Sequence, residues 1–289
     1  MGIRVARIVL FCVVMVVGVV AAAGARGAEA ATQPAFTVGH VDDAKLDELS
    51  GFVPSRKYPG VYWGHNDSDN PAEIWALNRE GHVIGKVPVV GAPNVDWEDI
   101  ALDEEGNLYI SDMGNNNCNR KEVHVYKFKG EPDLKGGAIR PVARWAIRYV
   151  GGKAFDCESL VVRGGWGYVM PKLRSYRSPE LYRFRVVPTD KPVTLEAVGG
   201  VTAVHGPVTG ADISVDGKWM AVLTVLGPYV LEIDGDPANA VKVKAATGHS
   251  AFVAIKMEAV CFVPEGVLAG TEEGEIYLFD WKMLGMGGR

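Results

Sequence analysis

Acidic residues head a series of short apolar segments in this sequence. The segments are "ELSGFVPS" at Glu48, "EDIALDEEG" at Glu98, "ESLVVRGG" at Glu158 and "EAVCFVPEG" at Glu258, and a fifth, "ADISVDG", begins at Ala211 with Asp212 one position later. Carboxylates that meet in a folded protein repel one another unless they hold protons, accept strong hydrogen bonds or share a cation. Carboxylate and carbonyl oxygens in a flexible arrangement suit calcium better than magnesium. The four glutamates and Asp212 are therefore candidate calcium ligands, and hydrogen bonds from neighbouring amides are the alternative.

Three other polar residues are candidates for proton transfer. His65 and Asp67 lie in "HNDSDNP", and Asp112 ends the segment "LYISD". Histidine titrates near neutral pH, so His65 beside Asp67 could act as a general base. The alternative is a simple turn, because Asn and Asp commonly bond to their own backbone in loops. Lys172 and Arg174 follow another segment and are suited either to an anionic group or to a solvated loop.

The acidic segments belong to a repeat that recurs about every 50 residues, close to the period of four-stranded propeller blades. Each unit continues with a second apolar strand and a third strand rich in aromatic residues, such as "EIWALN", "EVHVYKF", "ELYRFRV", "YVLEID" and "EIYLFDW". Short strands with glycine-rich turns and no helical periodicity are typical of a β-propeller. Fourth strands are expected at "HVIGKVPVV", "PVARWAIRYV", "VTLEAVGG" and "AVKVKAATG". The fifth unit has no fourth strand of its own.

The segment "AFTVGHV", residues 35–41, precedes the first unit and belongs to none of them. We expect it to supply the missing strand of the fifth blade, which closes the ring and leaves no open sheet edge. The sequence therefore predicts an all-β, five-bladed β-propeller that is closed by an N-terminal strand. No linker divides the repeats, so residues 31–289 are expected to form a single propeller domain.

Propeller geometry explains why acids stand at the heads of these segments. The first strand of a blade lines the central channel, and successive strands run antiparallel, so strand-one starts and strand-two ends share one face. The head glutamates are then expected around one mouth of the channel, together with the polar ends of the second strands.

Two stretches, "ELSGFVPSRKYPGVYWGHNDS" and "NVDWEDIALDEEGNLYISDMGNN", are similar to exported bacterial propeller proteins of undefined activity. Acidic heads on inner strands also resemble the calcium-centred propellers, which include soluble calcium-activated apyrases, gluconolactonase and paraoxonase lactonases, and phytase-like esterases. That resemblance implies that the ring glutamates hold calcium. Ala211 departs from the pattern and leaves the number of ligands open.

The first thirty residues have the pattern of a signal peptide: Arg4 and Arg7, an apolar run, and a small-residue end. We expect cleavage near Ala28 or Ala30, a secreted or periplasmic location and no membrane attachment afterwards; an uncleaved anchor is the alternative. The formal net charge is -5 with no basic block, which argues against nucleic acid as a partner. Three cysteines follow the signal region, and we expect a Cys118–Cys157 bridge and a buried thiol at Cys261. We also expect the protein to be a monomer.

Two classes of function fit this sequence. One is a metal-dependent hydrolase of a phosphoester, an anhydride or a lactone, in which calcium would activate the scissile group. The other is a non-catalytic binding or scaffold propeller with structural calcium, because this fold hosts many activities. In both cases the expected partner is a small-molecule or polymeric ligand at the channel mouth.

Overall fold

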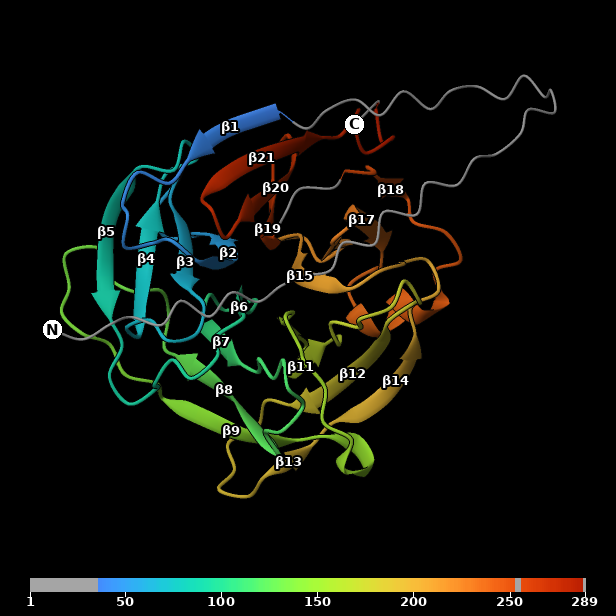
Figure 1. Cartoon of the computed structure of the whole chain (residues 1–289), viewed down its shortest axis with the longest axis horizontal. Coiled ribbons are helices and arrows are strands. Elements are labelled where there is room, and N and C mark those ends of the chain that lie inside the picture. The colour runs from blue at the N-terminus through green and yellow to red at the C-terminus, as the bar shows by residue number, and fades with distance from the viewer. Residues whose placement is uncertain (1–35, 253–255, 288–289) are drawn as a thin grey trace, which may run out of the picture. The chain divides into compact units, whose positions relative to one another are not determined.

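The computed structural model describes residues 36–252 and 256–287, which fold into five antiparallel sheets arranged as a five-bladed β-propeller (Figure 1). The predicted fold class is confirmed. The predicted signal peptide, residues 1–30, lies outside the described residues. None of the helices within the described ranges has the length and hydropathy needed to cross a membrane.

Each blade is one sheet, and in the first three blades the four main strands follow one another in the sequence. Blade one contains β2 (Leu49–Pro54), β3 (Tyr62–Asn66), β4 (Glu73–Leu77) and β5 (Val83–Pro88). Blade two contains β6 (Asp99–Leu102), β7 (Leu108–Asp112), β8 (Glu122–Phe128) and β9 (Ala143–Arg148). Blade three contains β10 (Val161–Arg163), β11 (Trp166–Val169), β12 (Glu180–Arg185) and β14 (Glu196–Gly200).

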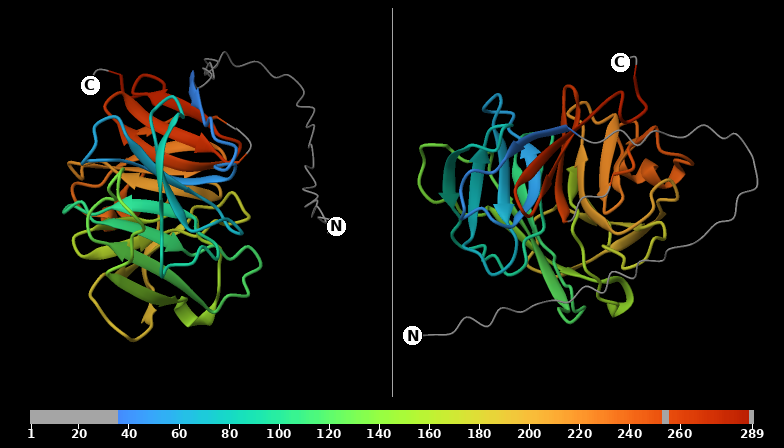
Figure 2. Two further views of the ribbon diagram at one scale, coloured as in Figure 1. Left: turned by 90° about the vertical axis from the view of Figure 1, so that its left-hand side faces the viewer. Right: turned by 45° about the horizontal axis from the view of Figure 1, so that its top comes forward.

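The last two blades follow the same order. Blade four contains β15 (Val208–Ile213), β16 (Trp219–Thr224), β17 (Gly227–Glu232) and β18 (Gly248–His249). Blade five contains β19 (Met257–Val263), β20 (Gly266–Thr271), β21 (Glu275–Asp280) and the N-terminal strand β1 (Phe36–His40). Strand β1 pairs antiparallel with β21 and lies beside it in both views of the ribbon (Figures 1 and 2). The predicted closing strand is therefore confirmed.

Two of the expected fourth strands differ from the prediction. In "VTLEAVGG" only β14 joins blade three, while β13 (Val193–Thr194) pairs in parallel with β9 and extends blade two. In "AVKVKAATG" the chain forms part of a short 3-10 helix, η2 (Pro237–Lys242), and the outer strand of blade four is limited to β18. Asp236 caps η2 by accepting a hydrogen bond from the Ala238 N–H, which favours the helical turn over a strand.

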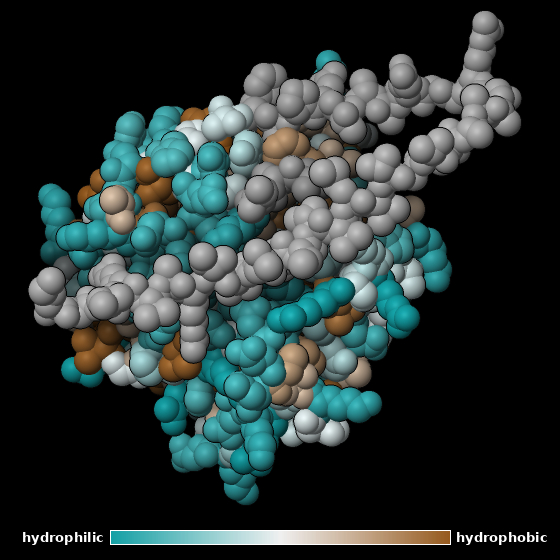
Figure 3. All heavy atoms as spheres, viewed as in Figure 1, coloured by the Kyte–Doolittle hydropathy of each residue, from teal (hydrophilic) through white to brown (hydrophobic). Residues whose placement is uncertain are grey.

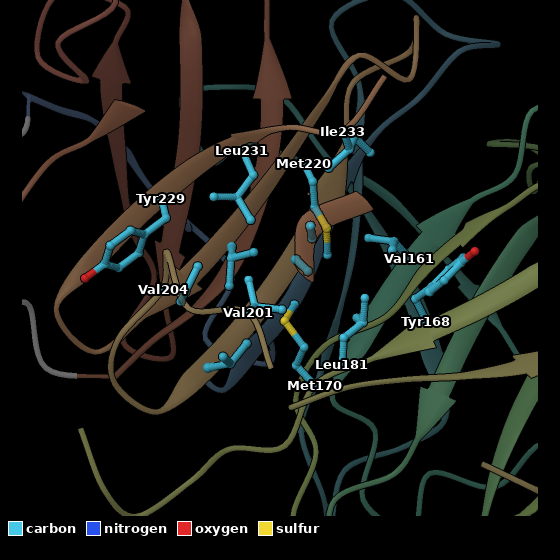
Figure 4. Close-up of a cluster of buried hydrophobic side chains, with 14 of the residues drawn as sticks. Val161, Tyr168, Met170, Leu181, Val201, Val204, Met220, Tyr229, Leu231 and Ile233 are labelled. Atoms are coloured by element: carbon cyan, nitrogen blue, oxygen red, sulfur yellow. The ribbon is translucent and has the colours of Figure 1, made fainter. Parts of the chain in front are cut away.

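Apolar side chains from adjacent blades form the core. Between blades three and four, for example, Val161 and Leu181 belong to the same buried cluster as Met220 and Leu231 (Figure 4). Each fully buried side chain of this kind contributes about 1.5–3 kcal/mol relative to an exposed one. The described part of the face in Figure 3 is mainly hydrophilic. Exposed large apolar residues such as Val95, Tyr176 and Val215 come from separate loops, as on ordinary soluble surfaces.

The predicted Cys118–Cys157 disulfide is wrong, because all three cysteines among the described residues are free. Cys118 is exposed at the loop after β7, whereas Cys157 is fully buried with its Sγ 3.3 Å from the Met170 carbonyl. The prediction that Cys261 is buried is confirmed.

Candidate functional site

The inner strands of blades four and five each contain an irregularity in strand pairing at the equivalent position. The register of β19 shifts at Glu258, and that of β15 shifts at Thr209, in each case opposite a threonine near the end of the second strand. Thr209 is therefore the counterpart of Glu258 in blade four. The expectation that Ala211 takes this place is wrong, since Ala211 lies two residues further along β15.

Asp212 lies deeper in the channel than the glutamates and is satisfied by a backbone amide. Its Oδ2 accepts a hydrogen bond of 2.8 Å from the Phe262 N–H of blade five. Asp99 is held in a similar way, with its Oδ2 2.7 Å from the Leu160 nitrogen of blade three. Burial raises the pKa of Asp212 to about 7. These two aspartates match the alternative in which amides from the next blade bind the carboxylates, and Asp212 lies outside the acid groups described below.

Glu48 does not occupy the ring position of blade one. The register of β2 shifts at Gly51, three residues further on, and Glu48 is half-buried with its Oε2 accepting a hydrogen bond from Asn70. A side chain at Gly51 would collide with His65, since a Cβ there would lie 2.9 Å from His65 Nε2. The predicted ring of four equivalent glutamates is thus reduced to Glu98, Glu158 and Glu258.

Blades two and three place two acids each at the channel mouth through the same short motif. The motif is Asp96-Trp97-Glu98 before β6 and Asp156-Cys157-Glu158 before β10. Its central residues, Trp97 and Cys157, are fully buried in the core. The two acids of each motif flank this buried residue, and their carboxylate oxygens lie close together at the mouth.

These acids form two groups that share Glu98. One group is Asp67, Asp96 and Glu98, and the other is Glu98, Asp156 and Glu158; in each, one oxygen per residue lies within 4.8 Å of the others. Gly114 makes the first group possible, because a Cβ at this position would lie 2.1 Å from Glu98 Oε1 and 2.5 Å from Asp96 Oδ2. We call the five acids of the two groups the carboxylate cluster.

A lysine ammonium neutralises the other side of the ring. Lys172 Nζ contacts Glu158 Oε1 and lies 3.0 Å from Glu258 Oε1. Burial alone would lower the pKa of Lys172, but the charges of Glu158 and Glu258 raise it well above its ordinary value. Glu258 is thus paired with a cation of the protein itself. Lys172 is a structural part of the mouth, rather than the solvated loop residue that the sequence also allowed.

Burial and neighbouring charges raise the pKa values of two acids of the carboxylate cluster, Glu98 and Asp67. Burial, followed by the charges of Glu158 and Asp67, raises the pKa of Glu98 well above its ordinary value. Burial raises the pKa of Asp67 to about 7, and the charge of Asp96 adds to this effect. Without a bound cation Asp67 is therefore only partly ionised near neutral pH. A cation would replace the protons.

Comparison of the chain with protein-family models and with curated proteins gives no match.

Two of the three residues proposed for proton transfer are buried away from solvent. His65 is fully buried, with its ring against Trp97, and burial lowers its pKa to about 4. Asp112 is also fully buried; its Oδ1 accepts hydrogen bonds from the Asp96 N–H and from Arg120, and burial raises its pKa to about 6. Asp112 thus positions Asp96, whereas Asp67 itself belongs to the carboxylate cluster.

Asp96 and Asp156 were not recognised as site residues from the sequence. The repeated Asp-x-Glu motif was the signal that could have identified them, because both copies precede an inner strand. Lys172 carried no comparable signal, since its role depends on a cross-blade contact with Glu258.

Proposed function

We propose that this protein is a calcium-binding propeller in which Asp67, Asp96 and Glu98 hold the ion at the channel mouth. The observation that carries the proposal is the convergence of these carboxylates within 4.8 Å. The guanidinium of Arg120 lies 4.0 Å from Asp96 Oδ2 and is already bonded to Asp112. All the proposed ligands are carboxylate oxygens from loops and strand ends, and oxygen is the donor that calcium prefers.

We propose further that the ion serves hydrolysis of a phosphoester, an anhydride or a lactone. Asp67 and Asp96 are only half-buried, so this side of the group is open to a ligand from solvent. When bound, calcium would polarise the scissile group or lower the pKa of a coordinated water. Of the three residues considered for proton transfer, Asp67 alone reaches the mouth, where its second oxygen can accept a hydrogen bond and orient a water molecule.

A non-catalytic binding propeller with structural calcium is the second candidate. The burial of His65 and Asp112 favours it, because neither side chain can reach a substrate at the mouth in this conformation. In this case the open side of the carboxylate cluster would take a small-molecule or polymeric ligand without transforming it.

Calcium titration followed by a turnover assay distinguishes these functions. We expect a chain that starts at residue 32 to bind calcium in calorimetry, and to bind magnesium more weakly. Glu98→Gln should bind much less calcium, because it removes a ligand charge while keeping the side-chain shape, whereas Asp190→Asn in an exposed loop should bind as the parent does. Calcium-dependent turnover in a panel of phosphoesters, anhydrides and lactones would support the hydrolase. Binding without turnover favours the second candidate, and no calcium binding overturns both.

A further inference from the structure

We propose that the channel mouth binds a second divalent cation between Glu98, Asp156 and Glu158, with Glu98 bridging the two ions. This inference rests on the proposed calcium site of Asp67, Asp96 and Glu98, because one carboxylate is common to both. The geometry allows it, since the oxygens of the second group also lie within 4.8 Å of one another. A carboxylate has two oxygens and can serve one ion with each of them.

An unpartnered oxygen distinguishes this group from an ordinary acidic cluster. Glu158 is 2% exposed, and its Oε2 has no hydrogen-bond partner. Its other oxygen, Oε1, is fixed by Lys172. A buried carboxylate oxygen without a donor is costly, and a cation would satisfy it.

Blade four contains an uncharged side-chain oxygen that is also buried without a hydrogen-bond partner. The hydroxyl of Thr209, which is 1% exposed, has no hydrogen-bond partner. Thr209 is the counterpart of Glu258 at the ring level, in the blade that follows Glu158 around the mouth. Unsatisfied oxygens therefore occur on this side of the ring, beyond the first calcium group.

The charges of the mouth also favour two ions over one. The carboxylate cluster has five acids, so a single divalent cation would leave three negative charges, whereas two would leave one. Lys172 provides one positive charge, which is shared between Glu158 and Glu258. Asp156 is fixed for such a role, because its Oδ1 accepts a 2.7 Å hydrogen bond from the Asn115 N–H and this orients its carboxylate.

Counting calcium ions per chain by native mass spectrometry tests the inference, with calorimetry as the second measurement. We expect two ions on the parent chain. Asp156→Asn should retain one, because asparagine keeps the hydrogen bond from Asn115 but lacks the ligand charge. Asp67→Asn should also retain one. Asp190→Asn is the control: it removes an acid from an exposed loop that belongs to neither group, so two ions should remain.

The possible outcomes separate the two proposals. One ion on the parent chain overturns the second site and leaves the first calcium site standing, and this count does not depend on whether any variant folds. No ion overturns both. Two ions that persist in a folded Asp156→Asn protein would also overturn the assignment of the second site to these residues.

Discussion

Replacing Asp67 by asparagine should stabilise the calcium-free protein at alkaline pH. In the folded chain, burial and then the charges of Asp96, Glu258 and Glu272 raise the pKa of Asp67 to about 7, against an ordinary value of 3.8, despite the hydrogen bond from the Ser68 N–H. The folded protein thus retains a proton that the unfolded chain loses at lower pH. Asparagine keeps the acceptor for Ser68 and has no charge to bury.

The sign and size of the change in the free energy of unfolding follow from this difference in pKa. Well below pH 3.8 Asp67 is protonated in both states and contributes no pH dependence. As the pH rises through 3.8 toward about 7, the unfolded chain releases its proton first, so the free energy of unfolding falls. The two values differ by about three pH units, and each corresponds to about 1.4 kcal/mol. The parent therefore loses ~4 kcal/mol through Asp67 by pH 8, and Asp67→Asn does not.

Urea unfolding in the presence of a chelator, at pH 4 and pH 8, measures this effect. The advantage of Asp67→Asn over the parent should be small at pH 4 and several kcal/mol at pH 8, while Asp190→Asn should follow the parent at both. Calcium should reverse the order at pH 8, because the variant has lost a ligand. The reasoning is refuted if the chelated variant at pH 8 is no more stable than the parent.

Three other outcomes are expected. Lys172→Met should lower the free energy of unfolding of the metal-free protein by about 3 kcal/mol at pH 7, because it leaves Glu158 and Glu258 buried without their cation. This loss of stability should be smaller at pH 5. A loss that is the same at both pH values in urea melts would contradict the charge argument. Deleting residues 36–42 should expose the edge of β21 and cause aggregation or a non-cooperative melt, so a soluble protein with a single sharp transition would speak against closure by β1. Thiol titration of the denatured chain from residue 32 onward, without reductant, should give three free thiols, and a count of one would restore the disulfide.

The architecture could be read from the sequence because every blade repeats the same local signals. Alternating apolar residues and glycine turns specify each hairpin, and the unassigned strand before the first repeat had only one open edge to pair with. The outer strand of blade four was misjudged since Pro237 and the Asp236 cap favour a helical turn over extended backbone.

The site was only partly predictable because register shifts are not visible in a single sequence. The extra residues at Gly51 and Thr209 displace Glu48 and Ala211 from the positions that simple alignment gives them. An alignment of the repeats by their first residues therefore predicts four glutamates in the ring, whereas the folded chain places three there. The approach of Lys172 to Glu258 joins different blades, so no local pattern could indicate it.

The pairing of β1 with β21 also determines when this protein can finish folding. The two partners come from opposite ends of the described chain, so four blades can form during synthesis while the fifth waits for residues 275–280 to emerge. Until then β1 has no partner strand, and the ring is open at the seam between blades five and one. Apart from β13, which joins blade two, strands leave the chain order only at that seam. A chain cut in a loop between two other blades and rejoined across the seam would contain the same five sheets. It would form its closing contact at a different stage of translation.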